Sequence, residues 1–223
     1  MSITLIIVII TCIISITGFT RPRVIDDLIF YPPAVKHGRQ YYRFISHGFI
    51  HADAGHLIFN MIALYSFGEN LEQIFGFECI FGHWGKLVFL LLYFTALIMA
   101  SLPDFFKHGD NHGFRSLGAS GAVSAIIFSS IIFLPQAKIG IFFLPGVPGY
   151  VFGVLYLIVS AYLDRRGGGR TNHAAHFWGA AYGIVFTLVM CQLLSNGFNV
   201  YENFVNQIRS SGNELVIPCD FDR

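Results

Sequence analysis

Residues 118–135, GASGAVSAIIFSSIIFLP, form an apolar run that begins with a serine framed by glycines, Ser120, and ends at a proline. A second run at 174–195, AAHFWGAAYGIVFTLVMCQLLS, places His176 at the corresponding position. Burying a polar group in hydrocarbon without a partner costs roughly 2–7 kcal/mol. We therefore expect this hydroxyl and this imidazole to be each other's partners, which suggests nucleophilic catalysis inside a membrane.

The composition agrees with a membrane environment. The 223 residues are 54% hydrophobic and 12% charged, whereas soluble domains carry about 25% charged residues. A lipid bilayer is the natural partner of this apolar excess. The net charge of +1, with no long block of one sign, argues against nucleic acid as a partner. The sequence does not indicate an oligomeric state.

Six segments are apolar over the roughly 17–25 residues that a spanning helix needs. The sequence predicts an all-α membrane protein, a single domain over residues 1–200 followed by a short polar tail at 201–223. The prolines and aromatic residues of the first connection, about 21–55, predict a loop partly inserted in the membrane interface. The six predicted spans are approximately 3–20, 56–78, 86–103, 118–135, 148–164 and 174–195.

In a chain with six spans, the N-terminal ends of the second, fourth and sixth lie on the same side of the membrane. His56 and Asn60 begin the second span, Ser120 the fourth and His176 the sixth. All four are within about two turns of a helix start, at 1.5 Å per residue. His56 and Asn60, four residues apart, share a helix face. The sequence therefore predicts a polar cavity that opens to one side.

Ser120 and His176 together supply a nucleophile and a base. No carboxylate is placed to orient the imidazole, so we expect a dyad. Taken alone, GASG is better explained as a helix-packing motif whose serine bonds its own backbone. However, the small residues at Gly118, Gly121 and Gly179 would let two membrane helices approach closely, as a Ser–His contact requires.

His56 and Asn60 can both donate hydrogen bonds near a helix N-terminus, which suits an oxyanion forming on an attacked carbonyl. The alternative is a polar cap where the chain leaves the lipid headgroups. His47, His51 and His56 could also suggest a metal, but no carboxylate or cysteine completes the set, so we expect none. The four cysteines lack CxxC spacing and are interpreted as small apolar fillers rather than as a zinc site or a disulfide framework.

The ordered motifs resemble the rhomboid family of intramembrane serine proteases. Their order and their placement on the second, fourth and sixth spans make coincidence a poor explanation. The resemblance covers about Tyr42 to Gly183. It rests on Tyr42-Arg43-Phe44, the stretch from His51 to Asn60 (HADAGHLIFN), Gly68-Glu69-Asn70-Leu71-Glu72 with Gly76, Gly118-Ala119-Ser120-Gly121, and the stretch from Ala175 to Gly183 (AHFWGAAYG).

The resemblance implies a six-transmembrane-helix, rhomboid-like bundle that cleaves transmembrane segments of other proteins entering from the lipid. It implies Ser120 as nucleophile, His176 as base, His56 and Asn60 at the oxyanion, and His51 as support for the nearby loop. It implies neither a metal nor an organic cofactor. It also places the protein in a membrane, expected to be a prokaryotic cell membrane, with the active face extracytoplasmic.

Two features depart from this resemblance. Family members often have a tyrosine four residues after the nucleophile, and this tyrosine stacks on the catalytic histidine. This chain has Ser124 at that position. Phe177 or another aromatic residue would have to substitute for the tyrosine. About ten Lys and Arg residues lie in the loops on the side of Ser120 and His176, and about four lie on the other side. The positive-inside rule would therefore place this side in the cytoplasm. The resemblance implies the opposite orientation.

Two other classes of function are alternatives to a protease. An inactive relative would bind transmembrane helices without cleaving them, and it would have no need of the intact pair Ser120 and His176. A small transporter would carry charges near the bilayer midplane and repeated halves. The sequence shows neither of these transporter features.

Overall fold

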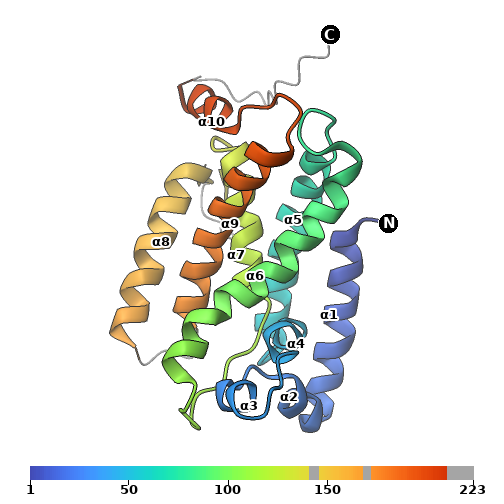
Figure 1. Cartoon of the computed structure of the whole chain (residues 1–223), viewed down its shortest axis with the longest axis vertical. Coiled ribbons are helices and arrows are strands. Elements are labelled where there is room, and N and C mark those ends of the chain that lie inside the picture. The colour runs from blue at the N-terminus through green and yellow to red at the C-terminus, as the bar shows by residue number, and fades with distance from the viewer. Residues whose placement is uncertain (141–145, 168–171, 210–223) are drawn as a thin grey trace.

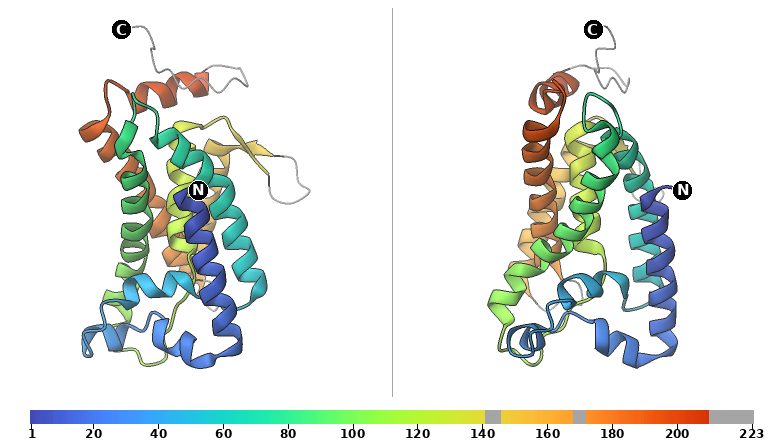
Figure 2. Two further views of the ribbon diagram at one scale, coloured as in Figure 1. Left: turned by 90° about the vertical axis from the view of Figure 1, so that its right-hand side faces the viewer. Right: turned by 45° about the vertical axis from the view of Figure 1, so that its right-hand side comes forward.

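Helices occupy all six apolar segments of the chain. The computed structural model describes residues 1–140, 146–167 and 172–209. Within them the long helices stand side by side as one bundle (Figures 1 and 2). They are α1 (Ile3–Thr20), α5 (Ala54–Phe75), α6 (Gly85–His108), α7 (Ser120–Phe133), α8 (Gly149–Arg166) and α9 (His173–Leu194).

Three of these segments are long and apolar enough to cross a membrane by length and composition. They are Ile3–Thr20, Gly82–His108 and His173–Leu194. Helix α7 is apolar but has only 14 residues. The chain is therefore a mostly helical protein with three candidate spans in its described part, and the count of six spans stays a prediction.

Short elements connect the long helices. The first connection contains α2 (Pro22–Leu28), α3 (Pro32–Lys36), α4 (Arg43–Ser46) and the 3-10 turn η1 (His47–Phe49). Buried Arg43 fixes this connection, because its guanidinium donates to the carbonyl oxygens of Asp26 and Ile29 at 2.9 and 2.7 Å. The remaining elements are η2 (Gly82–Trp84), the paired strands β1 (Lys138–Ile139) and β2 (Val147–Pro148), and α10 (Val200–Arg209).

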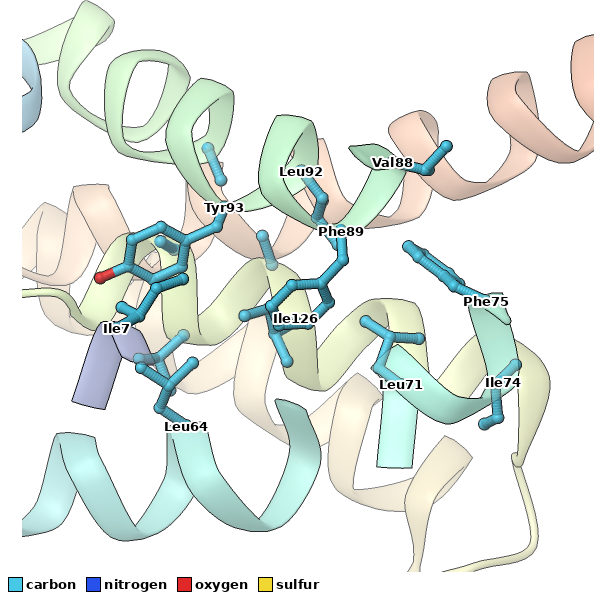
Figure 3. Packing of buried hydrophobic residues seen from close by; sticks show 14 of the residues in the cluster. Ile7, Leu64, Leu71, Ile74, Phe75, Val88, Phe89, Leu92, Tyr93 and Ile126 are labelled. Atoms are coloured by element: carbon cyan, nitrogen blue, oxygen red, sulfur yellow. The ribbon is translucent and has the colours of Figure 1, made fainter. Parts of the chain in front are cut away.

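The core lies where α5, α6 and α7 meet. Tyr93 and Phe89 of α6 and Ile126 of α7 are fully buried there (Figure 3). In contrast, large aliphatic side chains such as Ile13 and Ile158 are exposed on the outer helices. In water such a surface would be unfavourable, whereas in a bilayer it contacts lipid.

The end of the bundle far from Ser120 is held by polar caps on helix termini. Glu72 of α5 accepts hydrogen bonds from the backbone N–H groups of Ile3 and Thr4, at 3.0 Å each, and so satisfies the N-terminus of α1. The segment expected as a polar tail begins with α10, whose Asn203 donates to the carbonyl oxygen of Phe133 at the C-terminus of α7. Residues 210–223 lie outside the described residues, so the proposed domain limits stay a prediction.

The cysteines divide into two kinds. Cys191 is buried in the core and Cys12 packs against it, as expected for small apolar fillers, and both are free. Cys79 also packs against the core but is disulfide-bonded. The interpretation of Cys79 as a mere filler was therefore wrong, because widely spaced cysteines give no sequence signal of pairing. Cys219 lies outside the described residues.

Candidate active site

Helices α7 and α9 touch backbone to backbone, and this contact aligns the two predicted catalytic residues. A Cβ atom added to Gly179 would lie 2.1 Å from the carbonyl oxygen of Gly121, and one added to Gly183 would lie 2.3 Å from that of Ala125. The carbonyl oxygen of Ala175 lies 3.4 Å from the Cβ position of Gly121. Since Ser120 precedes Gly121 and His176 follows Ala175, the N-termini of α7 and α9 are neighbours.

A buried hydrogen-bond pair strengthens the same contact further along the helices. Thr187 of α9 donates from Oγ1 to Ser129 Oγ of α7 at 2.8 Å, and Ser129 in turn donates to the carbonyl oxygen of Gly183 at 3.2 Å. Both hydroxyl side chains are fully buried. Small residues and satisfied hydroxyls therefore hold α7 and α9 together, as is typical of helix pairs in membranes.

The loop that precedes Ser120 is fixed by His51. His51 Nδ1 lies 3.0 Å from Ser15 Oγ, and Ser15 donates its own proton to the carbonyl oxygen of Phe49. The Nδ1 atom must therefore carry a proton. The Nε2 atom then accepts the backbone N–H of Ala119 at 3.4 Å. His51 thus holds residues 109–119, the loop before Ser120, which is called the nucleophile loop after the predicted role of Ser120.

Burial keeps His51 neutral. It lowers the pKa of His51 to about 3, and the nearby His56 and His47 imidazoles add to this effect. Burial also lowers the pKa of His47 to about 4. The carbonyl oxygen of His47 accepts the N–H of Gly118 at 2.9 Å, so His47 and His51 hold the same loop.

Gly118 is required where this loop meets α5. Its φ is +114°, in the region that favours glycine, and an added Cβ would lie 2.7 Å from Cε1 of the His56 ring. The His56 imidazole is thereby placed against the residues leading to Ser120. His56, Ser120 and His176 all lie within the first four residues of α5, α7 and α9, respectively. The structure therefore brings His56, Ser120 and His176 to one end of the bundle, as the parity of the helices predicted.

Asn60 is buried and bonded to its own helix. It is 7% exposed, and its side-chain amide donates to the carbonyl oxygen of His56 at 2.9 Å. This bond uses one of the two N–H groups of the amide, and the predicted role of Asn60 at the oxyanion stays a prediction. The backbone N–H of Ser120 is a donor that sequence reasoning missed: it is in the first turn of α7, where helices leave N–H groups without intrahelical partners.

Ser120 and His176 do not form the expected direct hydrogen bond in the described part of the chain. The His176 ring instead stacks on Tyr156 of α8, with ring centroids 6.2 Å apart and planes inclined by 26°. Hydrogen bonds between a nucleophile and its base are often long without substrate and tighten when it binds. Tyr156 is the aromatic residue that accompanies His176; Phe177 contacts Trp178 instead.

Asn172 is a further residue that sequence reasoning missed. Its Oδ1 caps α9 by accepting the N–H of Ala175 at 3.0 Å. Its Nδ2 donates to Asp104 of α6 at 2.6 Å and to Ser116 of the nucleophile loop at 3.0 Å. One side chain thus joins three segments around the site. An asparagine just before a helix signals only the cap, because its other partners are distant in sequence.

The histidines do not assemble a metal centre in the described residues, where no group of three potential ligands occurs. His51 uses both ring nitrogens in hydrogen bonds. His47 has its Nε2 atom 3.0 Å from Ser101 Oγ. The His51 ring is therefore bonded to α1 and to the loop before Ser120, and the His47 ring is bonded to α6.

Comparisons with known proteins give a consistent result. The family model described as Rhomboid domain matches residues 38–193. The chain is 32% identical over 146 residues, 61% of its length, to RHOMBOID-like protein 12, mitochondrial, of Arabidopsis thaliana, and covers 43% of that protein. It is 30% identical over 141 residues, also 61% of its length, to presenilin-associated rhomboid-like protein A, mitochondrial, of Danio rerio, and covers 34% of it.

A bacterial relative is matched over more of its length. The chain is 24% identical over 174 residues, 77% of its length, to rhomboid protease GlpG of Haemophilus influenzae, and covers 82% of that protein. It spans less than half the length of the first two relatives. The match and the apolar helices indicate an integral membrane protein, but relatives named as mitochondrial leave the expectation of a prokaryotic membrane unsupported.

Proposed function

The chain belongs to the rhomboid family, and from this premise we propose that it is a serine endopeptidase that cleaves transmembrane segments of other proteins within the bilayer. The backbone contact between α7 and α9 supports the proposal, because it brings together the helix N-termini that carry Ser120 and His176. The protease activity named for the bacterial relative supports the same reaction.

In the proposed reaction, Ser120 is the nucleophile and His176 is the general base. Ser120 Oγ attacks the peptide carbonyl carbon as its proton passes to His176. The backbone N–H of Ser120 and the His56 ring stabilise the oxyanion, and Asn60 joins them through the second N–H of its side-chain amide. The C–N bond then breaks, and protonated His176 returns the proton to the leaving amine. Water, activated by His176, hydrolyses the acyl ester and frees Ser120.

Cleavage of a reporter tests this proposal. Purified protein in liposomes should cut a single-span substrate whose transmembrane segment contains small or helix-breaking residues. Ser120→Ala should abolish cutting because no other nucleophile replaces the hydroxyl, while Ser66→Ala, at an exposed serine of α5, should leave it unchanged. Full cutting by the Ser120→Ala protein would exclude the assigned nucleophile.

A second function is an inactive rhomboid-like protein that binds transmembrane helices. The observation that favours it is that Ser120 and His176 share no hydrogen bond in the described residues. Labelling with a fluorophosphonate separates the two functions, because only an activated serine reacts. Labelling that Ser120→Ala removes supports the protease, and unlabelled native protein supports the binder.

A further inference from the structure

We propose that Tyr156 of α8, held by Ser124, is the positioning residue for the base His176. This inference rests on the proposed function, since it assigns His176 its catalytic role. The juxtaposition joins three helices: His176 lies on α9, Tyr156 on α8, and Ser124 on α7, one turn after the proposed nucleophile. Four observations carry the assignment.

The first observation is the direction that Tyr156 faces. The buried residues of α8 are Gly149, Gly153 and Ser160, and positions 149, 153, 156 and 160 follow the spacing of one helix face. A Cβ added to Gly153 would lie 3.3 Å from the Phe128 ring of α7. Tyr156 is therefore on the stripe of α8 that packs against the bundle, and its ring also contacts Phe128 at 5.5 Å between centroids.

The second observation is the stacking on the base. The Tyr156 and His176 rings are inclined by 26° with centroids 6.2 Å apart. No hydrogen bond to a side chain holds the His176 ring within the described residues. An edge contact with His173, at 5.9 Å and 85°, is the other ring contact of His176. The tyrosine face is thus what limits the orientation of the imidazole.

The third observation is the direction of the hydrogen bonds. Ser124 donates its only proton to the carbonyl oxygen of Ser120 at 2.8 Å. The bond of 2.6 Å between Ser124 Oγ and the Tyr156 hydroxyl must then have the tyrosine as donor. A continuous chain of contacts therefore runs from the nucleophile's backbone, through Ser124 and Tyr156, to the base.

The fourth observation is the composition of the site. Within the described residues no carboxylate is bonded to the imidazole of the proposed dyad, and Ser124 is bonded to Ser120 and Tyr156, not to His176. Tyr156 supplies an aromatic surface from a different helix. Helix α8 packs against both α7 and α9, so it holds this ring beside His176.

The test measures how fast a fluorophosphonate labels the full-length protein at a series of pH values. Tyr156→Leu removes the ring and the hydroxyl, and should slow labelling by about tenfold, a loss of about 1.4 kcal/mol, and shift the midpoint of the pH–rate profile. Tyr156→Phe retains the ring but loses the hydrogen bond to Ser124, so its rate should lie between those of the native protein and Tyr156→Leu. Tyr162→Leu, at a 60% exposed tyrosine on the same helix, should match the native protein.

The outcomes separate positioning from folding and from the proposed function. Thermal unfolding of each variant shows whether the fold is retained; if Tyr156→Leu does not fold, Ser124→Ala replaces it and should also slow labelling and shift the profile. A native rate and a native pH profile in the folded variant would overturn the inference. Native protein that is never labelled would instead overturn the proposed function.

Discussion

At the residue scale, the buried His51 side chain makes two hydrogen bonds, one to another helix and one to the loop before Ser120. Its Nδ1–H is bonded to Ser15, and its Nε2 lone pair accepts the N–H of Ala119. Only the neutral ring can do both, because a protonated imidazole has no acceptor. The polar pair Ser15 and His51 is therefore tolerated in the interior, and it determines the path of the loop before Ser120.

This neutrality predicts a dependence of stability on pH. The unfolded chain protonates its histidines near pH 6.5, whereas the folded pKa of His51 is about 3 and that of His47 about 4. Over this interval the unfolded state binds more protons, so stability is full above pH 6.5 and falls as the pH drops toward 4. Thermal unfolding in detergent should show a lower melting temperature at pH 4.5 than at pH 7.5.

His51→Gln provides the matched comparison for this pH effect. A glutamine can donate to Ser15 and accept from Ala119 without titrating, so the fall between pH 7.5 and 4.5 should be smaller in this variant. Each kcal/mol corresponds to about 2–4 °C in a domain of this size. His83→Gln, at an exposed histidine, should keep the native slope. Equal slopes in all three proteins would contradict the role given to His51.

At the scale of elements, the closeness of α7 and α9 depends on residues without side chains. Gly121 and Gly179 allow the two backbones to meet beside the site, and Ala125 and Gly183 repeat the contact one turn further along. No hydrophobic driving force brings helices together in lipid, so the close approach of α7 and α9 stabilises the pair through van der Waals packing. The same contact fixes the relative depth of Ser120 and His176.

Gly179→Ala should therefore separate the helices and disable the site. The new Cβ would lie 2.1 Å from the Gly121 carbonyl oxygen, and because that atom belongs to the backbone, the helices must shift. A displacement near 1 Å costs about 10²-fold in rate when it affects catalytic geometry. Reporter cleavage should fall accordingly. Gly113→Ala, in an exposed loop with its nearest atom 3.4 Å away, is the control, and native activity in Gly179→Ala would refute the packing argument.

At the scale of the whole molecule, the bundle has two unlike ends. One carries the first connection, the nucleophile loop and the N-termini of α5, α7 and α9; the other carries the N-terminus of α1, the paired strands and α10 (Figures 1 and 2). The first end also holds most of the Lys and Arg residues, several of them engaged with the chain. Arg43 is buried against backbone carbonyls, and Lys36 pairs with Asp110 at 2.5 Å.

We predict that the end of the bundle that carries Ser120 and His176 faces away from the cytoplasm. Basic residues that are bonded within the first connection should influence the topology less than basic residues that are free in solvent. Lys107→Cys at this end and His83→Cys at the other, both exposed, should report the orientation in a background without other cysteines. In intact cells an impermeant thiol reagent should label position 107 and spare position 83. The reverse labelling would show that the positive-inside rule decides the topology.

The sequence by itself determined the helical class, the limits of the long helices to within a few residues, and the end of the bundle that bears Ser120, His176 and His56. Apolar length and chain parity are local or topological properties, so they can be read without coordinates. Only the tertiary structure revealed Tyr156 beside His176, Asn172 between α6, α9 and the nucleophile loop, and Asn60 bonded to its own helix. These contacts depend on helix rotation and rotamers, which are set by packing between residues far apart in the chain.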